Sequence, residues 1–570
     1  MKRFPCIPGS TRIGRHLLEG VFTLMLCFVW IDLSYAFSLR LLHLNDSHSR
    51  LDTEPYRFQR GQNTLVFSLG GAARIAAAVH RLAEGHDHVL FLHAGDSLRG
   101  TAYYTVFGGT ADMAVLNLLG IDAMVLGNHE FDDGADHLAT LLNDISFPVL
   151  AANITIRPGS ALDGRVRPWT LFSMDGVHIG VFGLILPATA TISSPGPDVA
   201  FTDPFAAARR AVSELRREGA DIVIALTHQG YDRDCAMARA LRGIDIVVGG
   251  HSHSLLGPPR LKKAGFHPEG PYPTVITGPQ GKRVFVVQAF HNFKVLGALD
   301  IEYDEHTGTV TAAGHSDILV DPQYDVTLRN QTQRRELSPQ NRYGLTPMKP
   351  DIVMAGLVQG FSAQLGEDTV VAHLDSSLSH RREPNAYGQG SEVAPLVAQA
   401  LFEAAEHQGV RVDAALINGG GIRDSLHQGD VTERDIDSVL PFGNTVVVLH
   451  LTGKQLKAAI AHGVHHGGGA FPAVYGLRIE GCPTPKGSWI MTGLFLDGGA
   501  SSGQAIDDKK QYTLVTITYL AQGGDGYPLK GVQALPLVPT VLERQAMKWF
   551  LQKTPRVYPQ QAPVVTVSCP

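Results

Sequence analysis

The polar stretch Gly127-Asn128-His129-Glu130-Phe131-Asp132-Asp133-Gly134 follows directly after the apolar run Ala123-Met124-Val125-Leu126. The apolar run predicts a short buried strand, and the glycine that follows it indicates a turn. Where the strands of an α/β sheet end, the side chains that follow line the crevice in which ligands bind. This stretch therefore brings an amide, an imidazole and carboxylates to a candidate site. A plain turn with a hydrogen-bonded histidine is the alternative.

The segment 37–325 alternates between short apolar runs and helix-like segments. Strands are expected at 39–44, 89–92, 123–126, 177–184, 222–226 and 244–248, and helices at 72–82, 111–119 and 204–217. Strands that alternate with helices indicate parallel or mixed sheets with helices on their faces. We therefore expect an α/β domain over this segment.

Five of the expected strands end in residues that could bind a metal ion. These endings are Asp46-Ser47-His48, Gly95-Asp96, Gly127-Asn128-His129-Glu130, Thr227-His228 and Gly249-Gly250-His251-Ser252-His253. Their donors are imidazoles and oxygens without thiolate, a set that suits zinc, manganese or a similar divalent ion. So many endings of this kind within one domain-sized segment indicate that a single crevice collects them.

Two divalent ions in one crevice need an anion between them. At about 4 Å they repel by on the order of 16 kcal/mol at an effective dielectric of about 20. One shared carboxylate with a bridging hydroxide meets that need, and Asp96 is the natural bridge. Asp46 and His48 would then hold one ion, while Asn128 and His228 hold the other.

Length and charge narrow the class of protein. A chain of 570 residues with 44% hydrophobic residues predicts two or three domains with buried cores. The formal net charge of -6 argues against nucleic-acid or anionic-membrane binding as the main activity. Residues 326–365 are expected to be a polar linker with a connecting helix, and 366–570 a second domain.

Three clusters in the expected second domain could bind a flat, phosphorylated ligand. Asn418-Gly419-Gly420-Gly421-Ile422-Arg423 follows an expected strand at 414–417. Its glycines permit close backbone approach, and its arginine offers a fork for phosphate. Phe442 and Tyr519 offer ring faces, and Asn444 and Asp525 offer polar groups for the edges of a heterocycle. Plain turns and core aromatics are the alternatives.

The amino terminus predicts a secretory signal peptide over residues 1–36. Basic residues precede an apolar run at 21–31, and small residues lead to an expected cleavage after Ala36. The run is too short for a comfortable membrane span, so no stable membrane anchor is expected, and a retained anchor is the alternative. We expect a periplasmic or secreted protein.

The cysteines are few and do not form a metal-binding pattern. Cleavage after residue 36 would leave Cys235, Cys482 and Cys569. Two of them could form a disulfide, and Cys482 with Cys569 is the pairing we expect. Other pairings stay open, because connectivity cannot be read from a sequence. No CxxC motif occurs, so a thiolate metal site is not supported.

Together the strand-end motifs resemble the signature of calcineurin-type metallophosphoesterases, and Gly127–Asp132 more narrowly resembles the exported 5'-nucleotidase family, which includes UDP-sugar hydrolases and NAD nucleotidases. The resemblance implies one metal bound by Asp46, His48, Asp96 and His253. It implies a second metal bound by Asp96, Asn128, His228 and His251. It also implies a catalytic dyad of His129 and Asp132, whereas Glu130 gains no metal-binding role from it.

The same resemblance extends to the second domain. It implies that Phe442 and Tyr519 stack on the base, that Asn444 and Asp525 contact base or ribose, and that Arg423 binds substrate. Two further arginines, Arg381 and Arg382, lie in about the right region, but residues 383–390 look inserted or altered. The implied fold is a four-layer-type metallophosphoesterase β-sandwich flanked by helices, linked by a helix to a second α/β nucleotide-binding domain that rotates to carry substrate to the metals.

We therefore expect an exported 5'-nucleotidase with two divalent metal ions, which hydrolyses nucleoside 5'-monophosphates with metal-activated water. Within the same site chemistry, the alternatives are cleavage of NAD or UDP-sugars, hydrolysis of 2',3'-cyclic nucleotides, or hydrolysis of a sulfur compound. An alternative of another class is a catalytically silent nucleotide-binding protein, against which the intact dyad argues. The sequence leaves the oligomeric state open.

Overall fold

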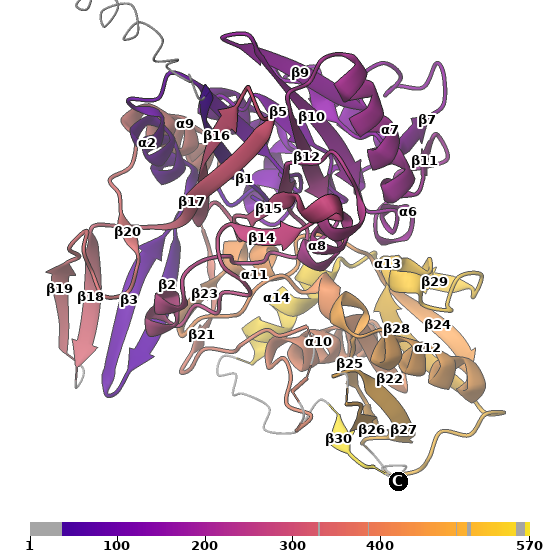
Figure 1. Cartoon of the computed structure of the whole chain (residues 1–570). Helices are drawn as coiled ribbons and strands as arrows, with labels where there is room; N and C mark the ends of the chain where they lie inside the picture. The colour runs from indigo at the N-terminus through magenta and orange to yellow at the C-terminus, as the bar shows by residue number, and fades with distance from the viewer. Residues whose placement is uncertain are drawn as a thin grey trace, which may run out of the picture.

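The computed structural model describes residues 37–328, 331–366, 368–382, 384–385, 387–485, 487–498, 503–554 and 565–569. The expected signal peptide lies outside these residues. Figure 1 shows two bodies of structure, an indigo-to-magenta one built from the first part of the chain and an orange-to-yellow one built from the last part. Within the described residues, none of the helices combines the length and the apolar character that a membrane crossing requires.

The first body is built on two large sheets. The first sheet has the order β19-β18-β3-β17-β16-β1-β4-β5-β6-β8, and the second has the order β14-β15-β13-β12-β10-β9. The strands of the first sheet are β19 (Gln331–Glu336), β18 (Gln323–Leu328), β3 (Asn63–Leu69), β17 (Thr309–Val320), β16 (Val295–Asp304), β1 (Phe37–Leu44), β4 (Val89–His93), β5 (Ala123–Val125), β6 (Val149–Leu150) and β8 (Val166–Arg167). Those of the second are β14 (Thr274–Thr277), β15 (Arg283–Gln288), β13 (Ile246–Gly249), β12 (Ile222–His228), β10 (Val177–Ile185) and β9 (Trp169–Met174).

Side-chain alternation places the two sheets face to face. Along β1, Leu39 and Leu41 join a core shared with β10, β12 and β13, whereas Leu42 and Leu44 join a core shared with helices. This is the period of two that sends successive side chains to opposite faces of a strand. Helices α2 (Ala72–Ala83) and α4 (Thr110–Leu119) cover the first sheet, and α7 (Pro204–Arg217) and α8 (Tyr231–Ala240) cover the second. The expected four-layer α/β sandwich is confirmed.

Local signals explain why several elements begin where they were expected. Helix α7 starts at Pro204, a residue suited to the first helical position, and the Asp203 side chain accepts hydrogen bonds from the N–H groups of Phe205 and Ala206. The strand expected at 244–248 is present as β13, but it begins at Ile246 and therefore starts two residues later than expected.

The segment expected to be a linker differs from that expectation. Strand β18 runs across the expected boundary at residue 325, and β18 and β19 form an antiparallel hairpin at the edge of the first sheet. Every residue of β19 is exposed, so this edge hairpin carries little of the apolar pattern that marks a strand in the sequence. Beyond it, the connecting helix α9 (Ile352–Ser362) starts at its cap Asp351 and packs against α2 and α4.

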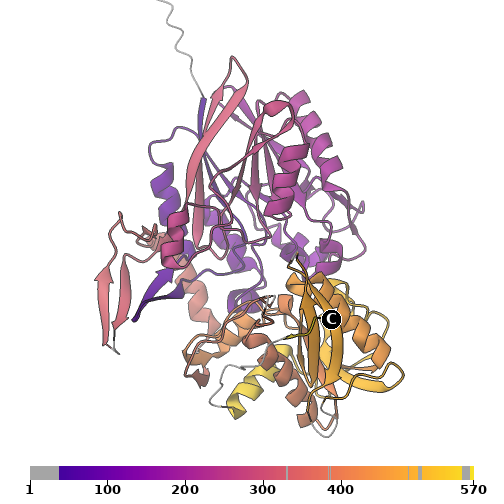
Figure 2. The same cartoon turned by 60° about the horizontal axis from the view of Figure 1, so that its bottom comes forward.

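The second body centres on a five-stranded mixed sheet. Its order is β25 (Pro472–Tyr475), β22 (Ala414–Asn418), β28 (Gln511–Ile517), β24 (Val446–Thr452) and β29 (Ala534–Pro536). Helices α10 (Val393–His407), α12 (Gly453–His466) and α14 (Glu543–Lys553) share one apolar core with this sheet. Figure 2 shows this orange-to-yellow body below the sandwich, in contact with it along one side.

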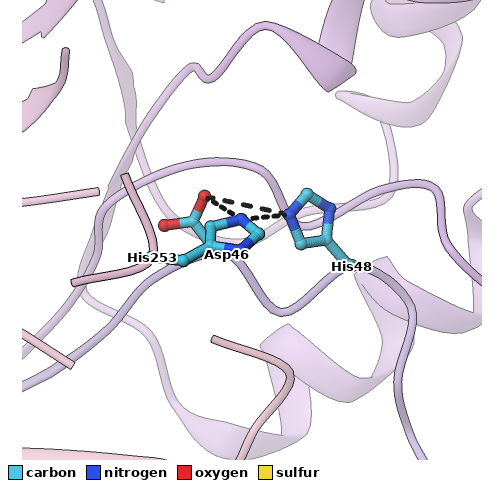
Figure 3. A group of neighbouring side chains, drawn as sticks. All are labelled: Asp46, His48 and His253. Atoms are coloured by element: carbon cyan, nitrogen blue, oxygen red, sulfur yellow. Dashed lines mark hydrogen bonds and ion pairs between the residues drawn. The ribbon is translucent and has the colours of Figure 1, made fainter. Parts of the chain in front are cut away.

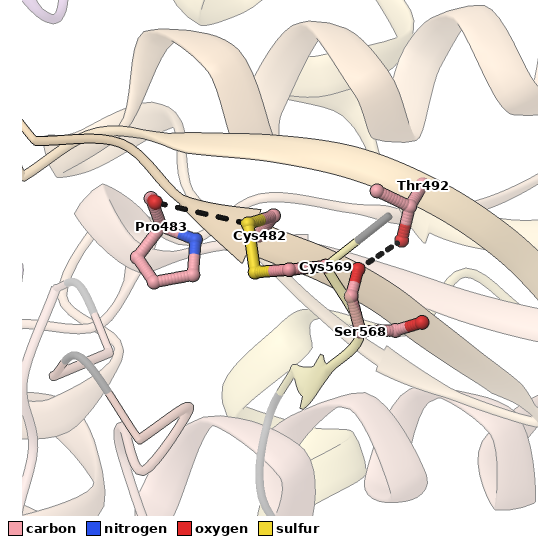
Figure 4. Close-up of a disulfide and its surroundings, with 5 residues drawn as sticks. All are labelled: Cys482, Pro483, Thr492, Ser568 and Cys569. Carbon is pink, nitrogen blue, oxygen red and sulfur yellow. Dashed lines mark hydrogen bonds between the residues drawn. A yellow bond between two sulfur atoms is a disulfide. The ribbon is translucent and has the colours of Figure 1, made fainter.

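A disulfide closes the second body. Cys482, at the end of β26 (Leu477–Pro483), is bonded to Cys569, with the two Cα atoms 4.9 Å apart (Figure 4). The pairing of Cys482 with Cys569 is therefore confirmed. Cys235 is free and buried.

Candidate active site

The candidate metal ligands lie where parallel strands end. Strands β1, β4 and β5 run parallel in the first sheet, and β10, β12, β13 and β15 run parallel in the second. The candidates are Asp46 and His48 after β1, Asp96 after β4, Asn128 after β5, His228 at the end of β12, and His251 and His253 after β13. Both sheets of the sandwich therefore contribute side chains to one edge of the domain.

Several of these residues hold a left-handed backbone. The φ angle is 51° at Asp46, 50° at His48, 55° at Asp96, 75° at His251 and 54° at His253. Such a conformation costs about 1–3 kcal/mol per residue and persists only where the surroundings enforce it. Here they do, because the Asp46 N–H donates to Gly95 O at 2.9 Å and the Asp46 carbonyl accepts from Asn292 N at 2.7 Å. The backbone is shaped to turn these side chains toward one another.

The first group of ligands is Asp46, His48 and His253, which Figure 3 shows side by side; the first two lie on the loop after β1 and the third on the loop after β13. The Nε2 atoms of the two histidines are 3.0 Å apart, and Asp46 Oδ1 lies 3.8 Å and 3.3 Å from them. Ligand atoms at about 2.0–2.2 Å from a shared ion are separated by distances of this size. The group therefore fits a divalent metal ion.

The second group is Asp96, His228 and His251, with the Asn128 amide beside it. His228 Nε2 lies 3.1 Å from Asp96 Oδ2, and His251 Nδ1 lies 3.0 Å from Asn128 Oδ1. His228 Nδ1 meets Ala94 O at 2.7 Å, which fixes the tautomer and turns Nε2 toward the site. Asp96 also groups with His48, so it lies between the two sets, as a bridging carboxylate must.

Electrostatics at this edge favour a bound cation. Burial alone would raise the pKa of the Asp96 carboxyl, but the neighbouring His228 and His129 outweigh it and hold that pKa well below its usual range. Burial likewise works against a charged His228, yet Asp96 raises its pKa to about 10. Burial lowers the pKa of His251 to about 3, which keeps this imidazole neutral. Because imidazole binds metal only in its neutral form, a divalent ion would take the place of the His228 proton.

His129 and Asp132 form a close pair. The short 3-10 turn η1 (His129–Phe131) brings them together, and His129 Nδ1 lies 2.7 Å from Asp132 Oδ2. Asp132 Oδ1 also accepts a hydrogen bond from Ser193 Oγ at 2.7 Å, which holds the carboxylate in place. With Nδ1 turned to the carboxylate, the other ring nitrogen, Nε2, lies 3.9 Å from Asp96 Oδ2 and faces the metal-ligand groups.

Glu130 ties the central loops together. Its buried carboxylate accepts hydrogen bonds from the backbone N–H groups of Asp96 (3.0 Å), Ser97 (2.8 Å) and Gly127 (2.7 Å). A Cβ at Gly127 would collide with Asp96, so only glycine allows this approach. Glu130 thus fixes the position of Asp96 without itself belonging to a ligand group.

One cavity of about 310 Å³ joins these groups to the second body. The expected substrate residues that line it are Arg382, Arg423, Phe442, Asn444, Tyr519 and Asp525, opposite Asp96, Asn128, His129, Asp132, His251 and His253. Arg381 is not among the lining residues, so of the two neighbouring arginines only Arg382 meets the cavity. A larger cavity of about 960 Å³, lined by residues such as Tyr272 and His315, contains none of these groups.

The second body's side chains are held by partners of their own. Asp525 Oδ1 accepts from Tyr519 Oη at 2.8 Å, and Asp525 Oδ2 accepts from Asn418 Nδ2 at 2.7 Å. Asn444 Nδ2 donates to the fully buried Glu543 at 3.2 Å. The Tyr519 hydroxyl therefore fixes the position of its ring against Asp525.

The phenylalanine of the second body meets the dyad directly. The Phe442 ring stacks on His129 with centroids 5.7 Å apart and planes inclined by 23°. Arg423 also contacts the Phe442 ring, with Cζ 5.7 Å from the ring centroid. Burial and the neighbouring Arg382 lower the pKa of Arg423 to about 10, so the two arginines form a local positive field suited to an anion.

Sequence reasoning missed several contributors to the cavity and its supports, among them Arg99, Ser193 and Glu543. Arg99 and Ser193 line the cavity, and Glu543 lies beneath Asn444. Arg99 stands only three residues after Asp96, which was the one available signal. Ser193 and Glu543 lie far along the chain from the residues they contact, and no motif marks them.

Comparison with known proteins agrees with this arrangement. Two family models match the chain, "Calcineurin-like phosphoesterase" over residues 39–255 and "5'-nucleotidase, C-terminal domain" over residues 370–531. A probable 5'-nucleotidase of Treponema pallidum is 33% identical over 525 residues, which cover 87% of this chain and 88% of that protein. The NAD 5'-nucleotidase of Haemophilus influenzae is 30% identical over 524 residues, which cover 87% of this chain and 86% of that protein.

A solved structure extends the agreement to the fold. The 5'-nucleotidase precursor from Thermus thermophilus superposes with a TM-score of 0.80 at 31% identity, covering 93% of this chain and 99% of that one. The likeness spans both bodies rather than the sandwich alone. The chain therefore belongs to the 5'-nucleotidase family and is a metal-dependent phosphoester hydrolase of that type.

Proposed function

We propose that this protein hydrolyses nucleoside 5'-monophosphates to nucleoside and phosphate, using two divalent metal ions. The observation that carries the proposal is the single cavity of about 310 Å³ that places the His129–Asp132 pair and the metal-ligand groups opposite two ring faces and two arginines. A ligand with a phosphate at one end and a flat heterocycle at the other matches this cavity, because the arginines and metal-ligand groups suit the phosphate and the aromatic rings suit the heterocycle.

The proposed ligand sets are Asp46, His48, Asp96 and His253 for one ion and Asp96, Asn128, His228 and His251 for the other. When bound, divalent ions at such a site lower the pKa of water to give a nucleophile and polarise a phosphoryl oxygen. Zinc and manganese suit the imidazole and carboxylate donors.

The chain's own groups supply the remaining steps. Arg382 and Arg423 would hold the phosphate oxygens, and Phe442 and Tyr519 would hold the base between their faces. His129 would present a proton at Nε2 to the phosphoryl group or the leaving oxygen, while Asp132 accepts the Nδ1 hydrogen bond and stabilises the imidazolium.

A second activity, cleavage of NAD or a UDP-sugar, has one observation in its favour: a relative named NAD 5'-nucleotidase that shares 30% identity over most of both chains. The cavity volume argues the other way, because about 310 Å³ is at the small end for ligand pockets. We therefore rank monophosphates first for this closed arrangement.

A substrate panel tests the proposal. Protein reconstituted with manganese or zinc is incubated with AMP, other nucleoside monophosphates, NAD, UDP-glucose and 2',3'-cyclic nucleotides, and free phosphate and nucleoside are measured. We expect the highest kcat/KM for a nucleoside 5'-monophosphate. Failure to release phosphate from every nucleotide with either ion would overturn the proposal.

We also propose that the protein is exported. The basic and apolar pattern of residues 1–36 supports this, as does the Cys482–Cys569 disulfide, which is typical of oxidising compartments. Cell fractionation and amino-terminal sequencing check it: the mature chain should start at Phe37, and a cytoplasmic protein that retains Met1 would contradict it.

A further inference from the structure

Arg99 is held on the first body by its own neighbours. It follows Asp96 by three residues in a left-handed backbone conformation (φ 68°), and its guanidinium lies over the Tyr104 ring with Cζ 4.6 Å from the centroid. Arg99 Nη2 pairs with Asp133, whose other carboxylate oxygen accepts from Tyr104 Oη at 2.7 Å. The arginine side chain is 12% exposed and therefore has a defined position.

The same guanidinium reaches across to the second body. Arg99 Nη1 donates to the backbone carbonyls of Pro441 and Phe442 at 3.4 Å and 3.5 Å. These two carbonyls belong to the turn that presents the Phe442 ring to His129. Arg99 of the first body thus contacts the backbone that carries the Phe442 ring in the second body.

A third contact links Arg99 to the dyad. Arg99 Nε lies 3.6 Å from Asp132 Oδ2, the oxygen that His129 Nδ1 contacts at 2.7 Å. A separation of 3.6 Å is too long for a hydrogen bond, and Nε has no hydrogen-bond partner among the described residues although it is buried. Arg99 therefore acts on Asp132 as an ion pair, which steadies the carboxylate by charge rather than by a directed hydrogen bond.

We propose that Arg99 is a positioning residue that makes the alignment of the His129–Asp132 dyad depend on the position of the second body. While Pro441 and Phe442 engage Nη1, the guanidinium stays beside Asp132, and its charge holds the carboxylate that His129 contacts. If those carbonyls withdraw, the guanidinium loses its contact with the second body, and Asp132 loses this support. This inference rests on the proposed nucleotidase function and assigns to that site a residue that couples closure to chemistry.

A second contact between the bodies provides a matched control. Arg50 Nη2 pairs with Asp424 Oδ2 at 2.9 Å, and Arg50 Nη1 pairs with Glu54 Oε1 at 3.0 Å. Arg50 is as enclosed as Arg99, with a side chain 10% exposed, but it does not line the catalytic cavity. Loss of Arg50 therefore weakens contact between the bodies without touching the dyad.

The test compares Arg99→Ala, Arg99→Lys and Arg50→Ala in the full metal-loaded chain, with melting temperature and metal content measured for each. Kinetics use AMP and bis(p-nitrophenyl) phosphate, a diester that reports on the metal centre without a nucleoside. We expect Arg99→Ala to lower kcat for AMP by about 10- to 100-fold, the scale of a misplaced catalytic group. Millimolar guanidinium should restore part of that loss, and Arg99→Lys should retain more kcat than Arg99→Ala.

Arg50→Ala should instead raise KM for AMP, keep kcat within about threefold, and show no rescue by guanidinium. The inference is overturned if both alanine variants show the same split between kcat and KM, or if guanidinium rescues neither. If Arg99→Ala does not fold, Arg99→Lys is compared with Arg50→Ala instead. The inference then requires Arg99→Lys to lower kcat and Arg50→Ala to raise KM. Absence of AMP hydrolysis by the wild-type chain would instead overturn the proposed function, so the two failures are distinguishable.

Discussion

The metal end and the nucleoside end of the cavity are built in different ways. At the metal end, the candidate ligands follow strands of one sandwich, and their loops are cross-linked by backbone hydrogen bonds such as His48 N to Asp96 O at 3.1 Å. At the nucleoside end, Phe442 lies in a turn and Tyr519 in the short helix α13 (Thr518–Ala521) of a separate body, which meets the sandwich through polar contacts such as those of Arg50 and Arg99. One end is preorganised, and the other depends on how two bodies meet.

This difference assigns separate tasks to the two regions. Changes at the metal end should affect every phosphoester, because they act on the reacting atoms. Changes at the nucleoside end should affect nucleotides and spare small esters. The following predictions would break or sharpen that division.

The largest effect is expected for Asp96→Asn. Because Asp96 lies between both ligand groups, we expect the content of both metal ions to fall and activity on all esters to drop by at least ~10⁴-fold. Metal analysis of the purified variant measures the first and phosphate release the second. Retention of one full equivalent of metal would show that Asp96 is not shared.

His129→Ala should lower kcat by about 10²- to 10⁴-fold, the usual contribution of a general acid–base group, while metal content stays at the wild-type level. The loss should hold for AMP and for bis(p-nitrophenyl) phosphate alike. A variant with normal turnover would remove His129 from the proposed dyad, and a variant without metal would make it a ligand instead.

Phe442→Ala should act only on nucleotides. An aromatic stacking contact is worth about 0.5–1.5 kcal/mol, so we expect KM for AMP to rise about 2- to 13-fold. The diester serves as the internal control and should change less than about twofold. An equal effect on both substrates would show that Phe442 serves His129, on which it stacks, rather than the base.

The smallest effect concerns stability at the metal end. Asp112, on α4, is buried, neither of its carboxylate oxygens has a hydrogen-bond partner among the described residues, and burial raises the pKa of its carboxyl to about 8. A folded pKa above the unfolded value near 3.8 means that stability from this group is complete below pH ~4 and is lost as pH rises toward 8.

Asp112→Asn removes that titration. We expect its advantage over wild type in free energy of unfolding to grow from pH 5 to pH 8 by up to about 4 kcal/mol, because one pKa unit corresponds to about 1.4 kcal/mol. Denaturant titrations at the two pH values measure it. A constant difference at both values would contradict the raised pKa.

The sequence predicted more of the metal end of the cavity than of the nucleoside end. Short apolar runs followed by Asp46, Asp96, Asn128, His228 or His251 were sufficient to predict strands whose carboxyl ends meet, because strand period and parallel order fix where those residues lie. The β18–β19 hairpin escaped prediction because its exposed edge carries no apolar pattern. Its residues resembled a linker for that reason.

At the nucleoside end, the sequence predicted the two aromatic residues but not the residues that hold the neighbouring turns in position. The bond from Asn444 to Glu543 joins residues 99 positions apart, and Arg99 meets the carbonyl of Phe442 across 343 positions. No local pattern marks such pairs, because they exist only once the chain has folded. The choice between Arg381 and Arg382 was open for the same reason, since neighbouring residues can point in opposite directions.

The most direct test of the central claim compares AMP with ribose 5-phosphate on the same metal-loaded enzyme. Both substrates carry the phosphoester to the metal ligands, but only AMP carries a base for Phe442 and Tyr519. Because stacking a base on aromatic rings is worth about 1–3 kcal/mol, we predict that kcat/KM for AMP exceeds that for ribose 5-phosphate by at least ~5-fold. Equal values for the two substrates, or no phosphate from AMP, would contradict a cavity in which one end performs the chemistry and the other selects nucleotides.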